Sequence, residues 1–145
     1  MSLPQAPIGP GLEQPITPAS GEGATERVDA IACLDERVRH QALPARPDQS
    51  GRYIEVQGPG RQALVLPLDD GVTHIGRGLH ADLRLDENSV SRRHAILVNR
   101  QAGVRLLDDR SSNGTYVNGR RITQTELRSG DILVLGRVVL RYLDV

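Results

Sequence analysis

The chain contains no lysine, tryptophan or phenylalanine, and Cys33 is the only cysteine among its 145 residues. The absence of lysine excludes a P-loop and any lysine Schiff base, and a lone cysteine excludes an internal disulfide. Eighteen basic residues, all arginine, balance eighteen acidic ones, so no net charge favours nucleic acid or an anionic membrane. The apolar run at 132–135 is too short to span a bilayer, and residues 1–4 do not begin a signal peptide. We therefore predict a cytoplasmic protein that neither binds nucleic acid nor inserts into a membrane.

Composition divides the chain near residue 50. Residues 1–24 are rich in proline, glycine, glutamine and serine without an apolar period, so we expect them to be disordered. Between 25 and 43 apolar residues recur at steps of three and four, which predicts a short amphipathic helix with Thr25 as its N-cap. Its apolar stripe consists of Val28, Ile31, Leu34 and Val38. The predicted organisation is a flexible tail over 1–50, containing a helix at 25–43, followed by one domain over 51–145.

The second part of the chain has the pattern of a β-protein. From residue 51 onward, turn residues recur every eight to twelve positions between short alternating or apolar segments. The predicted strands cover residues 52–57, 62–68, 72–76, 81–85, 93–99, 103–108, 115–118, 132–135 and 138–143. Pro67 lies within one of them and indicates an edge strand or a bulge. Many short strands at this spacing predict an all-β sandwich or barrel, with a core of Leu, Val, Ile and Ala.

Three predicted loops carry groups that suit a phosphate. Arg77 lies between two glycines at the end of a strand and presents a planar five-donor fork with little steric cover. Ser91, in the next loop, adds a hydroxyl beside Arg92. Asn113 offers an amide that both donates and accepts hydrogen bonds, although Asn-Gly is also a common hairpin turn. Each segment has an ordinary structural explanation when it is taken alone.

Taken together and in this order, the loop segments resemble a family signature. Gly76-Arg77, Ser91-x-x-His94 and Ser111-x-Asn113-Gly114-Thr115-x-Val117-Asn118-Gly119 are similar to the motifs of the forkhead-associated (FHA) domain, over about residues 52–145. The resemblance implies a β-sandwich of about eleven strands in two sheets that binds phosphothreonine peptides through loops at one end. The chain departs from the family pattern at Asp109, at Arg110 where glycine is common, and in a loop at 86–90 that is one residue longer than in many members.

The resemblance also implies roles for individual residues. Arg77 and Ser91 would contact the phosphate, and Asn113 would hold the peptide main chain. Arg92 and Ser112 would line the groove. Four further residues would be structural: Gly76, His94, Gly114 and Thr115.

These observations predict a non-catalytic adaptor or regulator in Ser/Thr kinase signalling, with no cofactor and no metal. Its partners would be threonine-phosphorylated proteins, including a Ser/Thr protein kinase, and a composition high in Arg, Ala and Gly without Lys favours a bacterial source. A triad of Ser91, His94 and Asp108 is disfavoured because the serine lacks a Gly-x-Ser-x-Gly elbow. A metal site is disfavoured because the available ligands have no recognisable spacing: Cys33, His40, His74 and His80.

Two alternatives remain open at this point. A kinase could modify Thr25 or Thr17, and the domain would then capture its own phosphorylated tail. In that case the residue three positions after the phosphothreonine would be Val28 for Thr25, or Ser20 for Thr17. Alternatively, the domain could be an oligomerisation or scaffold module that does not use phosphate.

Overall fold

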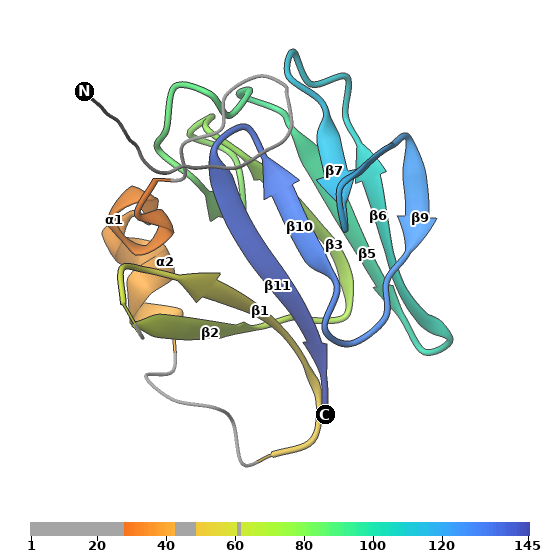
Figure 1. Ribbon diagram of the computed structural model, residues 1–145. Helices are drawn as coiled ribbons and strands as arrows, with labels where there is room; N and C mark the ends of the chain where they lie inside the picture. Colours follow the sequence, from red (N-terminus) through yellow and green to blue (C-terminus); the bar gives the residue numbers. More distant parts are fainter. Residues whose placement is uncertain (1–27, 43–48, 61) are drawn as a thin grey trace, which may run out of the picture.

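The computed structural model describes residues 28–42, 49–60 and 62–145, in which two β-sheets pack face to face (Figure 1). One sheet has six strands in the order β2-β1-β11-β10-β7-β8, and the other has five in the order β4-β3-β5-β6-β9. The strands are β1 (Arg52–Gln57), β2 (Ala63–Pro67), β3 (Gly71–Gly76), β4 (Leu83–Arg84), β5 (Ala95–Arg100), β6 (Gly103–Asp108), β7 (Thr115–Val117), β8 (Arg120–Ile122), β9 (Gln124–Glu126), β10 (Ile132–Leu135) and β11 (Val138–Asp144). The predicted sandwich of eleven strands in two sheets is confirmed.

Two of the eleven strands, β8 and β9, were not predicted from the sequence. Both have three residues, and most of their side chains are exposed, so they lack the alternation of apolar and polar residues that marks a half-buried strand. Each pairs along one side only, β8 with β7 and β9 with β6. Pro67 ends β2, which is an edge strand as the proline indicated.

Aliphatic side chains fill the space between the sheets, as the composition predicted. Those that are completely buried include Val56, Leu97, Leu106, Leu133, Leu135 and Leu140. The exception to an aliphatic core is Tyr142, which is 1% exposed and belongs to the same cluster. Burial is the main cause that raises the pKa of Tyr142 to about 12.

The segment predicted as one helix over 25–43 forms two short helices within its described part. They are α1 (Ala30–Cys33) and α2 (Glu36–Gln41). Asp29 caps α1 and Asp35 caps α2, because each carboxylate accepts hydrogen bonds from backbone N–H groups of the first turn. Between them Leu34 is extended and forms an isolated β-bridge with Leu85. The predicted cap Thr25 lies outside the described residues, as does the tail over 1–24.

The two helices pack against the sandwich rather than standing apart from it (Figure 1). Ala30, Cys33, Leu34 and Val38 are buried within the main hydrophobic cluster, and Val28 and Ile31 pack against that cluster. The guanidinium of Arg37 donates to the carbonyl of Ala81 at 2.9 Å. Residues 28–42 therefore contribute to the core, although the sequence placed them in a tail. Neither helix is long or apolar enough to cross a membrane.

If α1 and α2 are part of the folded unit, Leu34→Ala should destabilise the whole domain. Leu34 is 4% exposed, and truncating a buried leucine costs about 2–5 kcal/mol. The free energy of unfolding in urea measures the effect. Leu79→Ala is the matched control, because Leu79 is 81% exposed and its truncation should change stability by less than about 0.5 kcal/mol. Equal stability of the two variants would show that the helices do not contribute to the core.

Candidate functional site

The strand registers bring three loops to one end of the sandwich. Ile75 near the end of β3 pairs with Ala95 at the start of β5, and Ala95 pairs in turn with Asp108 at the end of β6. The loops that follow β3, precede β5 and follow β6 are therefore neighbours. These are the three loops in which the sequence placed its candidate residues.

The backbone joins the loop after β3 to the loop before β5. The N–H of Arg77 donates to the carbonyl of Ser91 at 2.9 Å, and the N–H of Gly78 donates to the carbonyl of Arg92 at 3.1 Å. Any side chain at Gly76 would overlap the Arg92 carbonyl, so only glycine permits this approach. The first two loops thus form one platform.

The Arg77 side chain lies across that platform and is half-buried. Its Nε donates to the carbonyl of Val90 at 3.0 Å, which fixes the guanidinium plane while the terminal nitrogens remain without a partner among the described residues. No acidic group of the described chain lies within ion-pair distance of Arg77 or of the exposed Arg92. Two adjacent, uncompensated guanidinium groups are a favourable environment for an anion.

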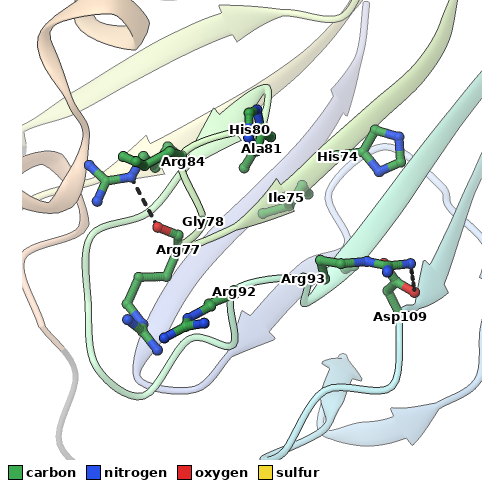
Figure 2. Close-up of a pocket in the computed structure, with 12 residues that line it drawn as sticks. His74, Ile75, Arg77, Gly78, His80, Ala81, Arg84, Arg92, Arg93 and Asp109 are labelled. Carbon is green, nitrogen blue, oxygen red and sulfur yellow. Dashed lines mark hydrogen bonds and ion pairs between the residues drawn. The ribbon is translucent and has the colours of Figure 1, made fainter.

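Figure 2 shows how the arginines of this region are arranged. Arg77 and Arg92 point toward the same side of the loops, whereas Arg93 points away and pairs with Asp109 at 3.1 Å. Arg77 and Arg92 also line a pocket of about 670 Å³ that extends toward His74 and His80 on and beyond β3. The charge of Arg93 is therefore neutralised by Asp109, whereas the charges of Arg77 and Arg92 are not neutralised by any described residue.

Ser91 connects the second loop with the third. Its hydroxyl oxygen accepts a hydrogen bond from the N–H of Ser112 at 2.9 Å. A serine hydroxyl that accepts one bond keeps its own hydrogen for donation. The side chain of Ser91 is half-buried, and that of Ser112 is exposed. The two serines therefore lie together at the surface, close to Arg77.

His94 joins the same two loops from below. Its side chain is completely buried; Nδ1 accepts from the N–H of Ser91 at 3.0 Å, and Nε2 lies 2.9 Å from the carbonyl of Gly114. Only the neutral imidazole with its proton on Nε2 satisfies both contacts. Burial is the largest influence on this group and lowers the pKa of His94 below its ordinary value, which keeps the ring neutral.

Asp108 organises the third loop, a role that the sequence interpretation missed. Its carboxylate accepts from the N–H of Ser111 at 3.3 Å, from the Ser111 hydroxyl, and from the hydroxyl of Thr115 at 2.7 Å. Burial opposes ionisation of Asp108, but these hydrogen bonds outweigh it and lower the pKa of the carboxyl. The available signal was an aspartate three residues before a serine, the spacing of a side chain that caps a turn.

Asn113 and Gly114 form the exposed tip and the buried base of the third loop. Nδ2 of Asn113 donates to the carbonyl of Ser89 at 2.8 Å, so its Oδ1 remains available. Gly114 has a φ of +87°, and a Cβ there would lie 2.8 Å from Nε of Arg121. Arg110 has a φ of 58°, which explains why glycine is favoured at this point of the loop, and its side chain is exposed.

The geometry does not support the catalytic and metal alternatives. Nδ1 of His94 accepts from the backbone of Ser91 rather than from its hydroxyl, and Asp108 makes its hydrogen bonds to Ser111 and Thr115. No group of three or more potential ligands gathers among the described residues. Cys33, the remaining candidate ligand beside the histidines, is the last residue of α1 and is buried.

Comparison with known proteins agrees with this fold and these loops. The model of the FHA domain matches residues 73–136. An oxoglutarate dehydrogenase inhibitor from Corynebacterium jeikeium is 32% identical over 122 residues, which cover 81% of this chain and 84% of that protein. Glycogen accumulation regulator GarA from Mycobacterium tuberculosis is 34% identical over 116 residues, which cover 80% and 71%. The chain belongs to the FHA domain family.

One further relative shares only the domain. The ABC transporter ATP-binding/permease protein Rv1747 of Mycobacterium tuberculosis is 37% identical over 91 residues, but these cover 10% of that protein and 63% of this chain. The names of the inhibitor and of GarA denote regulators and not enzymes, which supports the prediction that this chain is not an enzyme.

Solved structures with the same fold include one complex with a phosphopeptide. EmbR of Mycobacterium tuberculosis, in complex with a low-affinity phosphopeptide, has a TM-score of 0.60 at 31% identity, covering 74% of this chain and 28% of that one. A domain from a study of phosphothreonine-dependent FHA domain interactions has a TM-score of 0.59 at 29% identity, covering 66% and 96%.

The neutral state of His94 predicts a pH dependence of stability. Because its pKa is lower in the folded chain than in the unfolded chain, the unfolded state binds more protons as the pH falls below about 6.5. Stability should therefore decrease between about pH 7 and 5, with a slope of at most about 1.4 kcal/mol per pH unit from this residue. Urea unfolding at several pH values measures the slope.

His94→Ala should remove that slope and lower stability at pH 8 by about 2 kcal/mol or more, because it leaves two buried polar groups unpaired. His74→Ala, at an exposed position on β3, should behave like the wild type. A His94→Ala variant with an unchanged slope would contradict the assignment.

Proposed function

We propose that this chain binds threonine-phosphorylated segments of other proteins and acts as a regulator or adaptor in Ser/Thr kinase signalling. The observation that carries the proposal is the uncompensated guanidinium of Arg77, held in plane by the Val90 carbonyl and flanked by the Ser91 hydroxyl. A phosphothreonine carries about −1.5 to −2 charges and three acceptor oxygens. Arg77 supplies a positive charge opposite the phosphate, and Arg77 and Ser91 together supply hydrogen-bond donors for its oxygens.

The other candidate residues take roles that follow from their positions. Ser112, whose N–H is bonded to the Ser91 hydroxyl, borders the phosphate. Arg92 lines the groove and extends the positive surface. Asn113 presents a free Oδ1 that accepts from the backbone of an extended peptide. Four residues fix the conformation of the loops that carry these groups: Gly76, His94, Gly114 and Thr115.

The relatives support the proposal in two respects. EmbR, which shares the fold at 31% identity, has been solved with a phosphopeptide, and both regulatory relatives cover most of the present chain. A Ser/Thr protein kinase is a natural partner, because it creates the phosphothreonine and is often phosphorylated itself. We further propose that this activity takes place in the cytoplasm.

Arg77→Ala should weaken phosphothreonine-peptide binding by at least about tenfold, because each charge-assisted hydrogen bond contributes roughly 1.5–3 kcal/mol. The melting temperature should fall by no more than about 8 °C, since one bond to Val90 is lost. A titration with a degenerate phosphothreonine peptide library measures the affinity. Arg77→Lys should also weaken binding, because lysine keeps the charge but loses the planar fork.

The matched control for this experiment is Arg120→Ala, which removes an exposed arginine of β8 and should leave the affinity unchanged. The unphosphorylated library should not bind either protein. Wild-type protein that binds both libraries equally would refute the proposal and favour a phosphate-independent scaffold module.

A second candidate function is capture of the chain's own phosphorylated tail. The supporting observation is a series of contacts from Val28 to the candidate loops: the N–H of Val28 donates to the carbonyl of Arg137 at 3.2 Å, and the N–H of Arg137 donates to the Ser89 hydroxyl at 2.8 Å. Ser89 in turn contacts Asn113. Thr25 precedes Val28 by three residues, a reach of up to about 10 Å. This arrangement favours Thr25 as an internal ligand, with Thr17 as the alternative.

A chain that carries phosphothreonine at position 25 should bind an external phosphothreonine peptide at least about tenfold more weakly, because an internal ligand has an effective concentration in the millimolar range. Competition binding measures this difference. Thr25→Ala should abolish the effect of kinase treatment, whereas Thr17→Ala should not. Phosphorylated protein with undiminished affinity would exclude self-capture.

A further inference from the structure

The two residues that the proposed function uses most, Arg77 and Asn113, are held by the same short loop. Arg77 Nε donates to the carbonyl of Val90, and Asn113 Nδ2 donates to the carbonyl of Ser89, the preceding residue. These two side chains come from different loops and lie 36 positions apart in the sequence. The segment at 86–90 therefore sets the distance between them.

A partly buried ion pair holds this loop in place. Nη2 of Arg137, in the turn between β10 and β11, donates to Oε1 of Glu87 at 2.9 Å, and the Glu87 side chain is only 12% exposed. The other carboxylate oxygen of Glu87 accepts from the N–H of Ser89 at 2.8 Å and from the Ser89 hydroxyl. Burial opposes ionisation of Glu87, but these hydrogen bonds outweigh it and lower the pKa of the carboxyl.

The backbone of the β10–β11 turn makes a second connection to the same serine. The N–H of Arg137 donates to the hydroxyl of Ser89 at 2.8 Å. Gly136 has a φ of +61°, and a side chain there would overlap the Ser89 carbonyl, which is the atom that receives Asn113. Ser89 is thus fixed from two sides, by the Glu87 carboxylate and by the turn.

The N-terminal segment reaches both parts of this arrangement. The carbonyl of Cys33, at the end of α1, accepts from the N–H of Asp86 at 2.8 Å, which fixes the start of the loop. The N–H of Val28 donates to the carbonyl of Arg137, which fixes the turn. No residue of α1 lies in the three recognition loops, so its contribution is indirect.

We propose that Glu87 and Arg137 are positioning residues for phosphopeptide recognition: through Ser89 and Val90 they set where Asn113 and Arg77 present their free polar atoms. This inference rests on the proposed function. It adds to it a determinant that lies outside the family motifs. In a variant without the ion pair, the loop at 86–90 loses one of its two attachments to the β10–β11 turn, and the separation between the Arg77 and Asn113 side chains is no longer fixed.

Glu87→Gln tests the proposal because it removes the charge with little change in shape. We expect it to weaken a phosphothreonine peptide bound by the wild type about five- to twentyfold, with Arg137→Met as a second variant of similar effect. The control is Glu126→Gln, which breaks the exposed ion pair between Arg105 and Glu126, 3.2 Å apart on β6 and β9. That variant should change the affinity by less than twofold.

A double-mutant cycle separates positioning from general destabilisation. In an Asn113→Ala background, Glu87→Gln should lose the part of its effect on affinity that acts through Asn113, so the two substitutions should not be additive. In the free protein, the Nε–H resonance of Arg77 and the side-chain amide resonances of Asn113 should shift in Glu87→Gln but not in Glu126→Gln. Both measurements are made well below the melting temperature of each variant.

Unchanged affinity in Glu87→Gln and Arg137→Met, or full additivity with Asn113→Ala, would overturn the inference and leave the proposed function intact. Wild-type protein that binds no phosphothreonine peptide would refute the proposed function instead. In that case the spectra of the free protein still test whether Glu87 positions Asn113 and Arg77. If their resonances do not shift in Glu87→Gln, the positioning inference is overturned too.

Discussion

A neutral imidazole beneath the surface is the constraint on which the recognition end of this protein depends. His94 accepts from the backbone of one loop and donates to the backbone of another, and protonation of Nδ1 abolishes the first of these two contacts. Together with the backbone bonds between Arg77 and Ser91, this places three loops in one rigid arrangement before any ligand arrives. Backbone groups and the buried His94 supply the hydrogen bonds that hold the loops together. The side chains at the surface are therefore free for recognition.

Because the loops are fixed before a ligand binds, the free-energy cost of binding is reduced. Association is costly when flexible side chains must be ordered, and preorganised groups reduce that cost. Arg77 illustrates the principle, since one bond from Nε orients the fork and leaves the outer nitrogens available. Arg93, in the same loop as Arg92, is paired with Asp109, so the positive charge is concentrated at two positions instead of being spread along the loop.

The sequence was sufficient for the sandwich and for the motifs of the three loops, because both depend on local patterns. Alternating apolar residues mark the strands of the core, and turn residues mark the loop tips. It was not sufficient for β8 and β9, whose exposed side chains carry no period. The break between α1 and α2 depends on the bridge from Leu34 to Leu85, a tertiary contact that the helical spacing does not reveal.

The same limit applies to the site. Glycine and serine motifs are visible in the sequence, but the pairing of Glu87 with Arg137 joins positions 50 residues apart. The buried role of α1 is also invisible, since an amphipathic stripe indicates that a helix packs on something without indicating what it packs on. Residues that hold a site from outside its motifs can be identified only from three-dimensional contacts.

The position of Cys33 makes its thiol a probe for the detachment of α1 from the sandwich. Cys33, at the end of α1, is 8% exposed and belongs to the core cluster. Burial, followed by the negative charges of Glu87, Asp29 and Asp86, raises the pKa of its thiol above the ordinary value. A thiol-reactive reagent should therefore modify Cys33 slowly while α1 is packed on the sandwich and faster when the helix is detached. Because the chain has one cysteine, the rate at which Cys33 is alkylated reports on the detachment of α1 without any engineered label.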